Sequence, residues 1–143
     1  MSEKWGRRLF ATGSILLILA GLAHSLSLLQ NPVPANDTER QLMDLMSNYH
    51  INIMGSMRSM DDFMRGFSIA FMLAMFAIGA LDLVLRRERA ALLKRVALVN
   101  SIWLALMTAV SLRYFFAAPL TFMLSGFVLF GLAWMMLPAA TKN

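Results

Sequence analysis

Four long stretches that are almost free of charge limit, more than any other feature, what this sequence can fold into. No Lys, Arg, Asp or Glu occurs in 9–30, 96–112 or 114–137, and 66–85 contains only Asp82. The hydrocarbon core of a bilayer is about 30 Å thick, and a helix needs about 20 apolar residues to cross it. Because backbone groups in lipid must form hydrogen bonds within their own segment, runs of this length predict helices and not barrel strands.

We therefore predict an all-α integral membrane protein, a bundle of four transmembrane helices in one membrane domain over residues 1–143. The composition agrees, since 59% of the residues are apolar and 15% are charged, against about 45–50% and 25% in soluble domains. A signal peptide is the alternative for the first run, but its apolar part would have about 7–15 residues and a cleavage site, and this run is longer and lacks a convincing site. The predicted spans are about 8–30, 62–85, 94–115 and 119–138, with a long connection at 31–59.

Composition also excludes several classes of function. The chain has no cysteine, which rules out disulfides, thiolate metal sites and thiol redox chemistry. The basic residues flank the apolar runs and form no stripe interleaved with aromatic residues, so a nucleic-acid partner is not expected. The two histidines, His24 and His50, have no metal-ligand spacing, and we expect no metal and no cofactor. A haem held between them is the alternative.

Lysine and arginine are divided unequally between the two sides of the predicted bundle. Nine of the 13 fall on the side of the two termini, whereas the other four are mixed with acidic residues on the opposite side. Because cytoplasmic loops carry the excess of Lys and Arg, this pattern predicts a multi-pass protein with both termini in the cytoplasm and the long connection outside. The nine are Lys4, Arg7, Arg8, Arg86, Arg87, Arg89, Lys94, Arg95 and Lys142.

The long outer connection contains one predicted short helix. Pro32 and Pro34 end the first span, and Asn36 followed by Glu39 is typical of a helix N-terminus. Apolar residues then recur every three or four positions, which predicts an amphipathic helix of about three turns, too short to span. It would lie on the membrane surface or cover the bundle as a lid, and His50 behind it would be an ordinary interfacial residue. The apolar positions are Leu42, Leu45, Met46, Tyr49 and Ile53.

Ionisable residues gather near the outer end of the predicted bundle. One histidine lies near the end of the first span, acidic and basic residues open the second, and an arginine closes the third. Such groups are costly inside a membrane and usually serve a site. We take His24 and Asp62 as candidate catalytic residues, because an inward carboxyl beside a histidine could hold a proton and pass it on. The candidate ligand-binding residues are Arg58, Asp61, Arg65, Ser111 and Arg113.

Helical spacing indicates how the second span would pack. Small residues at every fourth position would let a neighbouring helix approach closely, and Asp62 lies one turn before them on the same face. Arg65 can pair with Asp61 at i,i+4 or with Asp62 at i,i+3. The small residues are Gly66, Ala70 and Ala74.

Two further polar features lie within the spans. Asp82 precedes Arg86 by one turn, and we expect these two side chains to pair near the interface. Asn100, Thr108 and Ser111 share one face of the third span.

A resemblance to known proteins covers most of the chain. Its motif is Met-Gly-Ser-Met-Arg-Ser at 54–59, then Asp-Phe at 62–63 and Arg-Gly-Phe at 65–67. These residues resemble a family of small, uncharacterised bacterial membrane proteins, from whose usual pattern the chain departs at Ala23, Met57 and Met64. The resemblance implies a four-helix fold in a bacterial inner membrane and no particular activity. It draws attention to His24, Arg58, Asp62 and Arg65.

Three functions are compatible with these residues. The leading hypothesis is a protein that binds a hydrophobic or amphipathic small molecule in a cavity at the outer end of the bundle, surrounded by membrane lipid. The first alternative is an acid–base enzyme of the isomerase, hydratase or cyclase class that acts on a lipidic substrate. The second is an accessory or structural subunit of a homo- or hetero-oligomeric complex, in which the charged cluster only pins helix ends.

Overall fold

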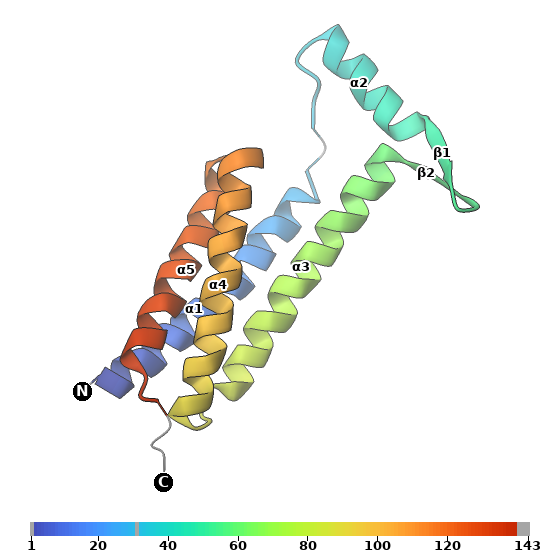
Figure 1. Cartoon of the computed structure of the whole chain (residues 1–143). Coiled ribbons are helices and arrows are strands. Elements are labelled where there is room, and N and C mark those ends of the chain that lie inside the picture. Colours follow the sequence, from blue (N-terminus) through green and yellow to red (C-terminus); the bar gives the residue numbers. More distant parts are fainter. Residues whose placement is uncertain (1, 31, 140–143) are drawn as a thin grey trace. The chain divides into compact units, whose positions relative to one another are not determined.

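The computed structural model describes residues 2–30 and 32–139. Four helices are long and apolar enough to cross a membrane. Helix α4, with 25 residues, is about 37 Å long at 1.5 Å per residue, which exceeds the hydrocarbon core. The predicted all-α fold, with four transmembrane helices and one short amphipathic helix, is therefore confirmed. In chain order (Figure 1) the elements are α1 (Ser2–Ser27), α2 (Asp37–Asn48), β1 (His50–Ile53), β2 (Ser56–Ser59), α3 (Met60–Leu85), α4 (Ala90–Tyr114) and α5 (Ala117–Met136).

The chain forms two compact units. The first contains residues 2–21 of α1, residues 75–85 of α3, and all of α4 and α5. The second contains the remaining parts of α1 and α3, together with α2 and the hairpin of β1 and β2. Helices α1 and α3 thus contribute to both units.

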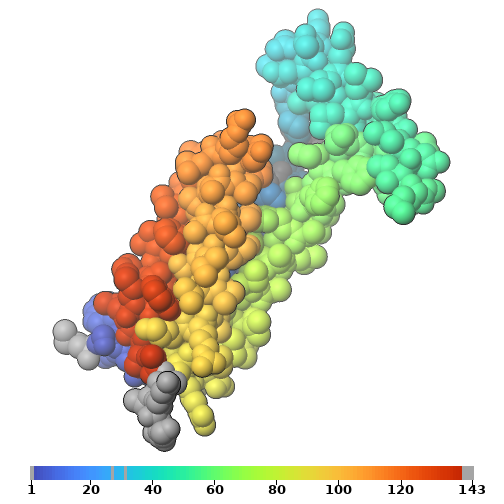
Figure 2. All heavy atoms as spheres, viewed as in Figure 1, coloured from blue at the N-terminus to red at the C-terminus, as the bar shows by residue number. Residues whose placement is uncertain are grey.

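Helices α4 and α5 lie side by side in the first unit (Figures 1 and 2). The Phe10 ring of α1 meets the Phe130 ring of α5 edge-on, with 5.5 Å between the ring centroids. A Cβ at Gly13 would lie 2.9 Å from the Phe130 ring, so glycine leaves room for this contact. The buried residues of α4 recur every three or four positions, as expected for one face of a helix. They are Leu93, Ala97, Asn100, Ser101, Leu104, Thr108 and Ser111.

Helix α3 approaches α1 closely at Gly79. A Cβ at this position would lie 2.8 Å from the carbonyl oxygen of Ser14 and 2.8 Å from Cγ1 of Ile18. Any larger residue would push the two helices apart, because Ser14 presents backbone here. Met75, Gly79 and Asp82 form the buried face of α3.

The stripe of small residues predicted as a packing surface is not the one that packs in this structure. Gly66, Ala70 and Ala74 are exposed, and a Cβ at Gly66 would meet nothing within 4 Å. Small size permits close helix contact but does not by itself create it. The difference lies in the neighbour, since the backbone of α1 faces Gly79, whereas no atom of the described residues lies within 4 Å of a Cβ at Gly66.

One end of the first unit brings together the start of α1, the end of α3, the start of α4 and the end of α5. Arg7 Nη1 donates a hydrogen bond to the carbonyl oxygen of Glu88 at 2.8 Å, which ties α1 to the loop after α3. Lys94 Nζ donates to the carbonyl oxygen of Leu137 at 2.7 Å, which ties α4 to the end of α5. We call this region the basic end; it comprises 2–8, 86–95 and 137–139.

Helix α2 of the second unit begins where the sequence predicted. Asn36 Oδ1 accepts a hydrogen bond from the Glu39 N–H at 2.9 Å, and Glu39 Oε2 accepts one from the Ala35 N–H at 2.7 Å. These side chains satisfy amide groups that the first turn leaves unpaired, much as in a capping box. No residue of α2 is buried, and Leu42 and Leu45 are more than half exposed. Its apolar face is therefore uncovered.

A β-hairpin, which the sequence did not predict, joins α2 to α3. Its strands are antiparallel, with His50 opposite Ser59, and φ is positive at both turn residues, Met54 (51°) and Gly55 (87°). Two positive φ values are typical of a type I′ turn, in which Asn, Asp or Gly usually comes first. Methionine at the first turn position explains why the sequence carries no clear hairpin signal.

Candidate functional site

The polar residues at the start of α3 are organised by a capping box in the second unit. The Ser59 N–H donates to Asp62 Oδ2 at 3.0 Å, and the Asp62 N–H donates to Ser59 Oγ at 3.1 Å. Ser59 is only 3% exposed, whereas Asp62 is exposed. The pattern of Ser and an acidic residue three positions later could have been recognised in the sequence. Asp62 therefore has a structural role, whatever else it contacts.

The β-hairpin brings two further charged or titratable residues to Asp62. Arg58 and His50 lie close enough to act electrostatically on the Asp62 carboxyl group. The hairpin register explains this, because His50 pairs with Ser59, the residue that shares the capping box. The His50 ring nitrogen Nδ1 lies 2.9 Å from the carbonyl oxygen of Asn48. The histidine that the hairpin brings opposite Ser59, the capping partner of Asp62, is thus His50, which the sequence predicted to be an ordinary interfacial residue.

Arginine side chains at this site differ in how they are engaged. Arg65 Nη2 lies 4.0 Å from Asp61 Oδ2, so the predicted i,i+4 pair forms, with both side chains at least half exposed. Arg58 Nη1 donates to the carbonyl oxygen of Met57 at 2.8 Å. Arg58 makes no ion pair with a side chain in the described part of the chain, so its charge acts on Asp62 only at longer range.

His24 lies elsewhere in the second unit. Its ring packs edge-on against the Phe71 ring, with 5.2 Å between centroids and 73° between the planes. Phe71 comes nine residues after Asp62, which is about 13 Å along a helix. The structure therefore does not bring His24 and Asp62 together, and the proposed proton relay between them has no contact to support it.

The other two predicted ligand-binding residues belong to the first unit. Ser111 is 2% exposed and lies on the buried face of α4. Arg113 is exposed, and its guanidinium carbon lies 5.6 Å from the centroid of the Tyr114 ring.

In the first unit, Asp82 pairs with a buried polar residue and not, as the sequence predicted, with Arg86. Its carboxyl oxygen Oδ2 accepts a hydrogen bond from Asn100 Nδ2 at 2.6 Å, and Asp82 is 2% exposed. The expected partner, Arg86, is exposed and makes no ion pair with Asp82. The reason is the helix face: Asp82 follows Gly79 and Met75 on the buried stripe of α3, so its side chain turns inward.

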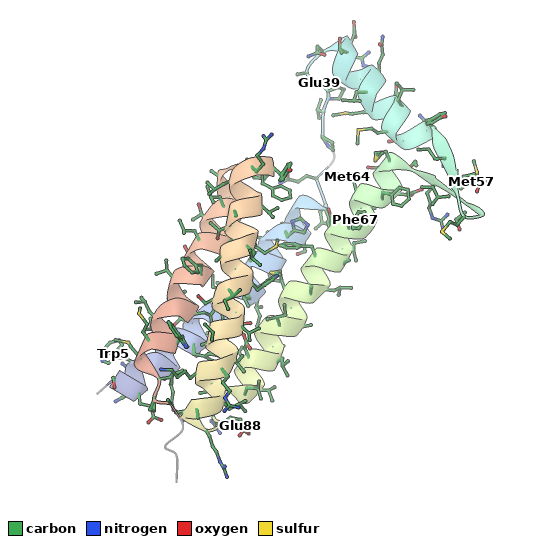
Figure 3. All side chains as sticks on the ribbon, viewed as in Figure 1. Trp5, Glu39, Met57, Met64, Phe67 and Glu88 are labelled. Carbon is green, nitrogen blue, oxygen red and sulfur yellow. The ribbon has the colours of Figure 1, made fainter. Side chains whose placement is uncertain are left out.

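Large apolar side chains alternate in sequence with the polar residues at the start of α3. Four of them are about half exposed or more, although they adjoin a charged cluster. Figure 3 labels Met57 on β2 and Met64 and Phe67 on α3. The four are Met57 (52% exposed), Met60 (46%), Met64 (56%) and Phe67 (73%). The site therefore combines an arginine that forms no ion pair in the described part of the chain with exposed apolar side chains.

Within residues 2–30 and 32–139, no three histidine, cysteine, aspartate or glutamate side chains come together in a way that could hold a metal ion.

Comparison of the chain with protein-family models, curated proteins and solved structures gave no match.

Proposed function

We propose that this membrane protein binds a hydrophobic or amphipathic small molecule at the start of α3. The observation that carries the proposal is that Arg58, which forms no ion pair within the described residues, lies in the same segment of chain as the exposed apolar side chains of Met64 and Phe67. Met64 and Phe67 follow one another at i,i+3 on α3, so they share one face and can contact an apolar chain lying along the helix. Phe67 is 73% exposed. Its ring therefore offers a large apolar area that a bound ligand would cover.

The remaining N–H donors of Arg58 favour a ligand whose head group is acidic or accepts hydrogen bonds. Asp62 already accepts a bond from Ser59, and Arg65 already pairs with Asp61. The guanidinium of Arg58 has donors left after its bond to Met57, since arginine carries five N–H donors. A carboxylate is the kind of group that such a fork binds well.

The acid–base alternative receives less support from the geometry. It needs His24 and Asp62 in contact, and His24 packs against Phe71 instead. The geometry thus favours ligand binding, and His24 makes an aromatic contact between α1 and α3.

A photoactivatable fatty acid tests the proposal. Full-length protein in mixed micelles is labelled with palmitic acid that carries a diazirine in its chain, and labelled peptides are mapped by mass spectrometry. Labelling in 57–67 should saturate and be displaced by unlabelled palmitic acid. The double variant Met64→Ala/Phe67→Ala should weaken it about tenfold, which corresponds to losing part of two apolar contacts. Arg58→Gln should weaken labelling by the acid more than labelling by the matching fatty alcohol.

A matched pair of exposed apolar residues in the first unit provides the control. Leu112 is 68% exposed and Phe115 is 57% exposed, so Leu112→Ala/Phe115→Ala removes similar surface away from the site. It should leave the saturable labelling unchanged. Labelling that does not saturate and spreads over all four spans would reject the proposal.

We further infer that the protein lies in a bacterial inner membrane with its basic end in the cytoplasm. The support is the excess of Lys and Arg at that end, which the positive-inside rule associates with the cytoplasm. A reporter that works only in the cytoplasm should be active when it is fused after Asn143. Activity of a reporter that works only outside the cytoplasm would contradict this orientation.

A further inference from the structure

An open pocket of about 350 Å³ lies at the basic end of the first unit. Its walls come from two segments far apart in the sequence, the first turns of α1 and the loop after α3. Five of the six lining side chains are cationic, and the sixth is a small apolar one that lies one turn further along α1. The six are Lys4, Arg7, Arg8, Ala11, Arg86 and Arg87.

Arg7 holds the two walls of this pocket together. Its Nη1 donates hydrogen bonds to the carbonyl oxygens of Arg86 at 3.2 Å and Glu88 at 2.8 Å, and its Nε pairs with Glu3 Oε1 at 2.9 Å. The guanidinium is therefore occupied with protein acceptors. These bonds hold the loop after α3 against α1, so that the loop arginines lie beside the cations of α1.

The remaining cations of the pocket lack acidic partners. Lys4, Arg8, Arg86 and Arg87 form no ion pair with any side chain among residues 2–30 and 32–139. Like charges held close together repel one another, and a bound anion would relieve that repulsion. Membrane orientation requires basic residues at this end, but it does not require that they line one pocket.

Tryptophan rings lie beside basic side chains at this end of the first unit. The Arg8 guanidinium carbon lies 5.1 Å from the centroid of the Trp5 ring, and Lys94 Nζ lies 5.8 Å from that of Trp134. Trp is enriched at the boundary between lipid and water, and long basic side chains extend toward the same layer. Figure 3 shows Trp5 and Glu88 at this end of the unit. In a bilayer, this enrichment would bring the cations to the depth of the lipid phosphate groups.

We propose that this pocket binds the phosphate of an anionic phospholipid headgroup between the cations of α1 and those of the loop after α3. Ala11 leaves space for the phosphate near α1, and the acyl chains run beside the apolar part of the helices. This site is separate from the amphipathic-ligand site at the start of α3, and it takes a lipid of the surrounding leaflet. Basic pockets at helix ends are known to recognise headgroups in this manner.

Lipid competition on the full-length protein tests the proposal. The protein is released from micelles that contain equal amounts of phosphatidylglycerol and phosphatidylcholine with the same acyl chains, and native mass spectrometry measures the lipids that remain bound. Phosphatidylglycerol should be retained over phosphatidylcholine by about fivefold or more, the factor that one near-surface cation supplies. The variants Arg86→Gln/Arg87→Gln and Lys4→Gln/Arg8→Gln should each abolish this preference.

The control variant removes the same number of positive charges, but from residues that do not line the pocket. Arg89 and Arg95 are exposed at the same basic end but do not line the pocket, so Arg89→Gln/Arg95→Gln should retain the preference. Equal loss in this control would show a general charge effect and overturn the proposed site. No preference in the unmodified protein would overturn it as well.

Glycerol 3-phosphate distinguishes a lipid from a soluble phosphate. In micelles without anionic lipid, the protein should bind none of it at millimolar concentration. An adduct that forms there and is lost in Arg86→Gln/Arg87→Gln would assign the pocket to a soluble phosphate compound and overturn the lipid assignment.

Discussion

Asn100 on α4 donates a hydrogen bond of 2.6 Å from Nδ2 to Oδ2 of Asp82 on α3, and the two residues are 7% and 2% exposed. A polar group buried away from water is costly unless it is hydrogen-bonded. This bond therefore satisfies two buried groups and joins two transmembrane helices, a common use of polar side chains in membranes.

Removal of one partner should cost more than removal of both. Asn100→Leu leaves the Asp82 carboxyl group buried without its donor and should lower the free energy of unfolding by about 1–3 kcal/mol. The double variant Asp82→Leu/Asn100→Leu should recover part of this loss, because no unpaired polar group remains. Unfolding in detergent micelles with increasing denaturant measures both. Additive losses in the double variant would show that the two side chains do not stabilise each other.

Gly79 and Gly66 provide a matched pair on α3. Gly79→Ala should destabilise the protein by about 1–3 kcal/mol, because overpacked contacts force helices to shift, and its Cβ would lie 2.8 Å from the Ser14 carbonyl oxygen. Gly66→Ala meets no atom within 4 Å and should leave stability unchanged or raise it by up to about 1 kcal/mol through helix propensity. Thermal unfolding in micelles compares the two. An equal effect of both substitutions would contradict the close contact at Gly79.

The capping box at the start of α3 predicts a local effect of changes at Asp62. Asp62→Ala removes the acceptor for the Ser59 N–H and should destabilise the first turn by about 1 kcal/mol, so its amides exchange with solvent about fivefold faster. Asp62→Asn keeps a side-chain oxygen at the same place and should preserve most of the protection. Hydrogen exchange followed by mass spectrometry over 59–64 reports both. Slow exchange in Asp62→Ala would show that the cap is dispensable.

Helix α2 can be tested as a membrane-surface anchor. Its apolar face is uncovered, and an amphipathic helix of this kind lies in the interface with that face toward lipid. The chain has no cysteine, so Leu45→Cys and Asp44→Cys can each carry a single spin label. In vesicles the label at Leu45 should collide more with oxygen and the one at Asp44 more with a water-soluble nickel complex. The same pattern at both positions would favour a lid or another arrangement away from lipid.

Spans, caps and local pairs were readable from the sequence because each depends on neighbouring residues. A charge-free run must cross lipid as a helix wherever its neighbours lie. The Asn36–Glu39 start of α2 and the Asp61–Arg65 pair involve residues within one helical turn, and both form as predicted.

Tertiary structure decided which residues meet across elements. Periodicity places Asp82 one turn from Arg86 and Asp62 one turn from a stripe of small residues, but it cannot say which face is covered. The neighbouring helices turn Asp82 toward Asn100, and the β-hairpin, which has an atypical turn residue, pairs His50 with Ser59, the capping partner of Asp62. The physical reason is range: hydropathy and capping act along the chain, whereas burial and side-chain partners depend on segments far apart in sequence.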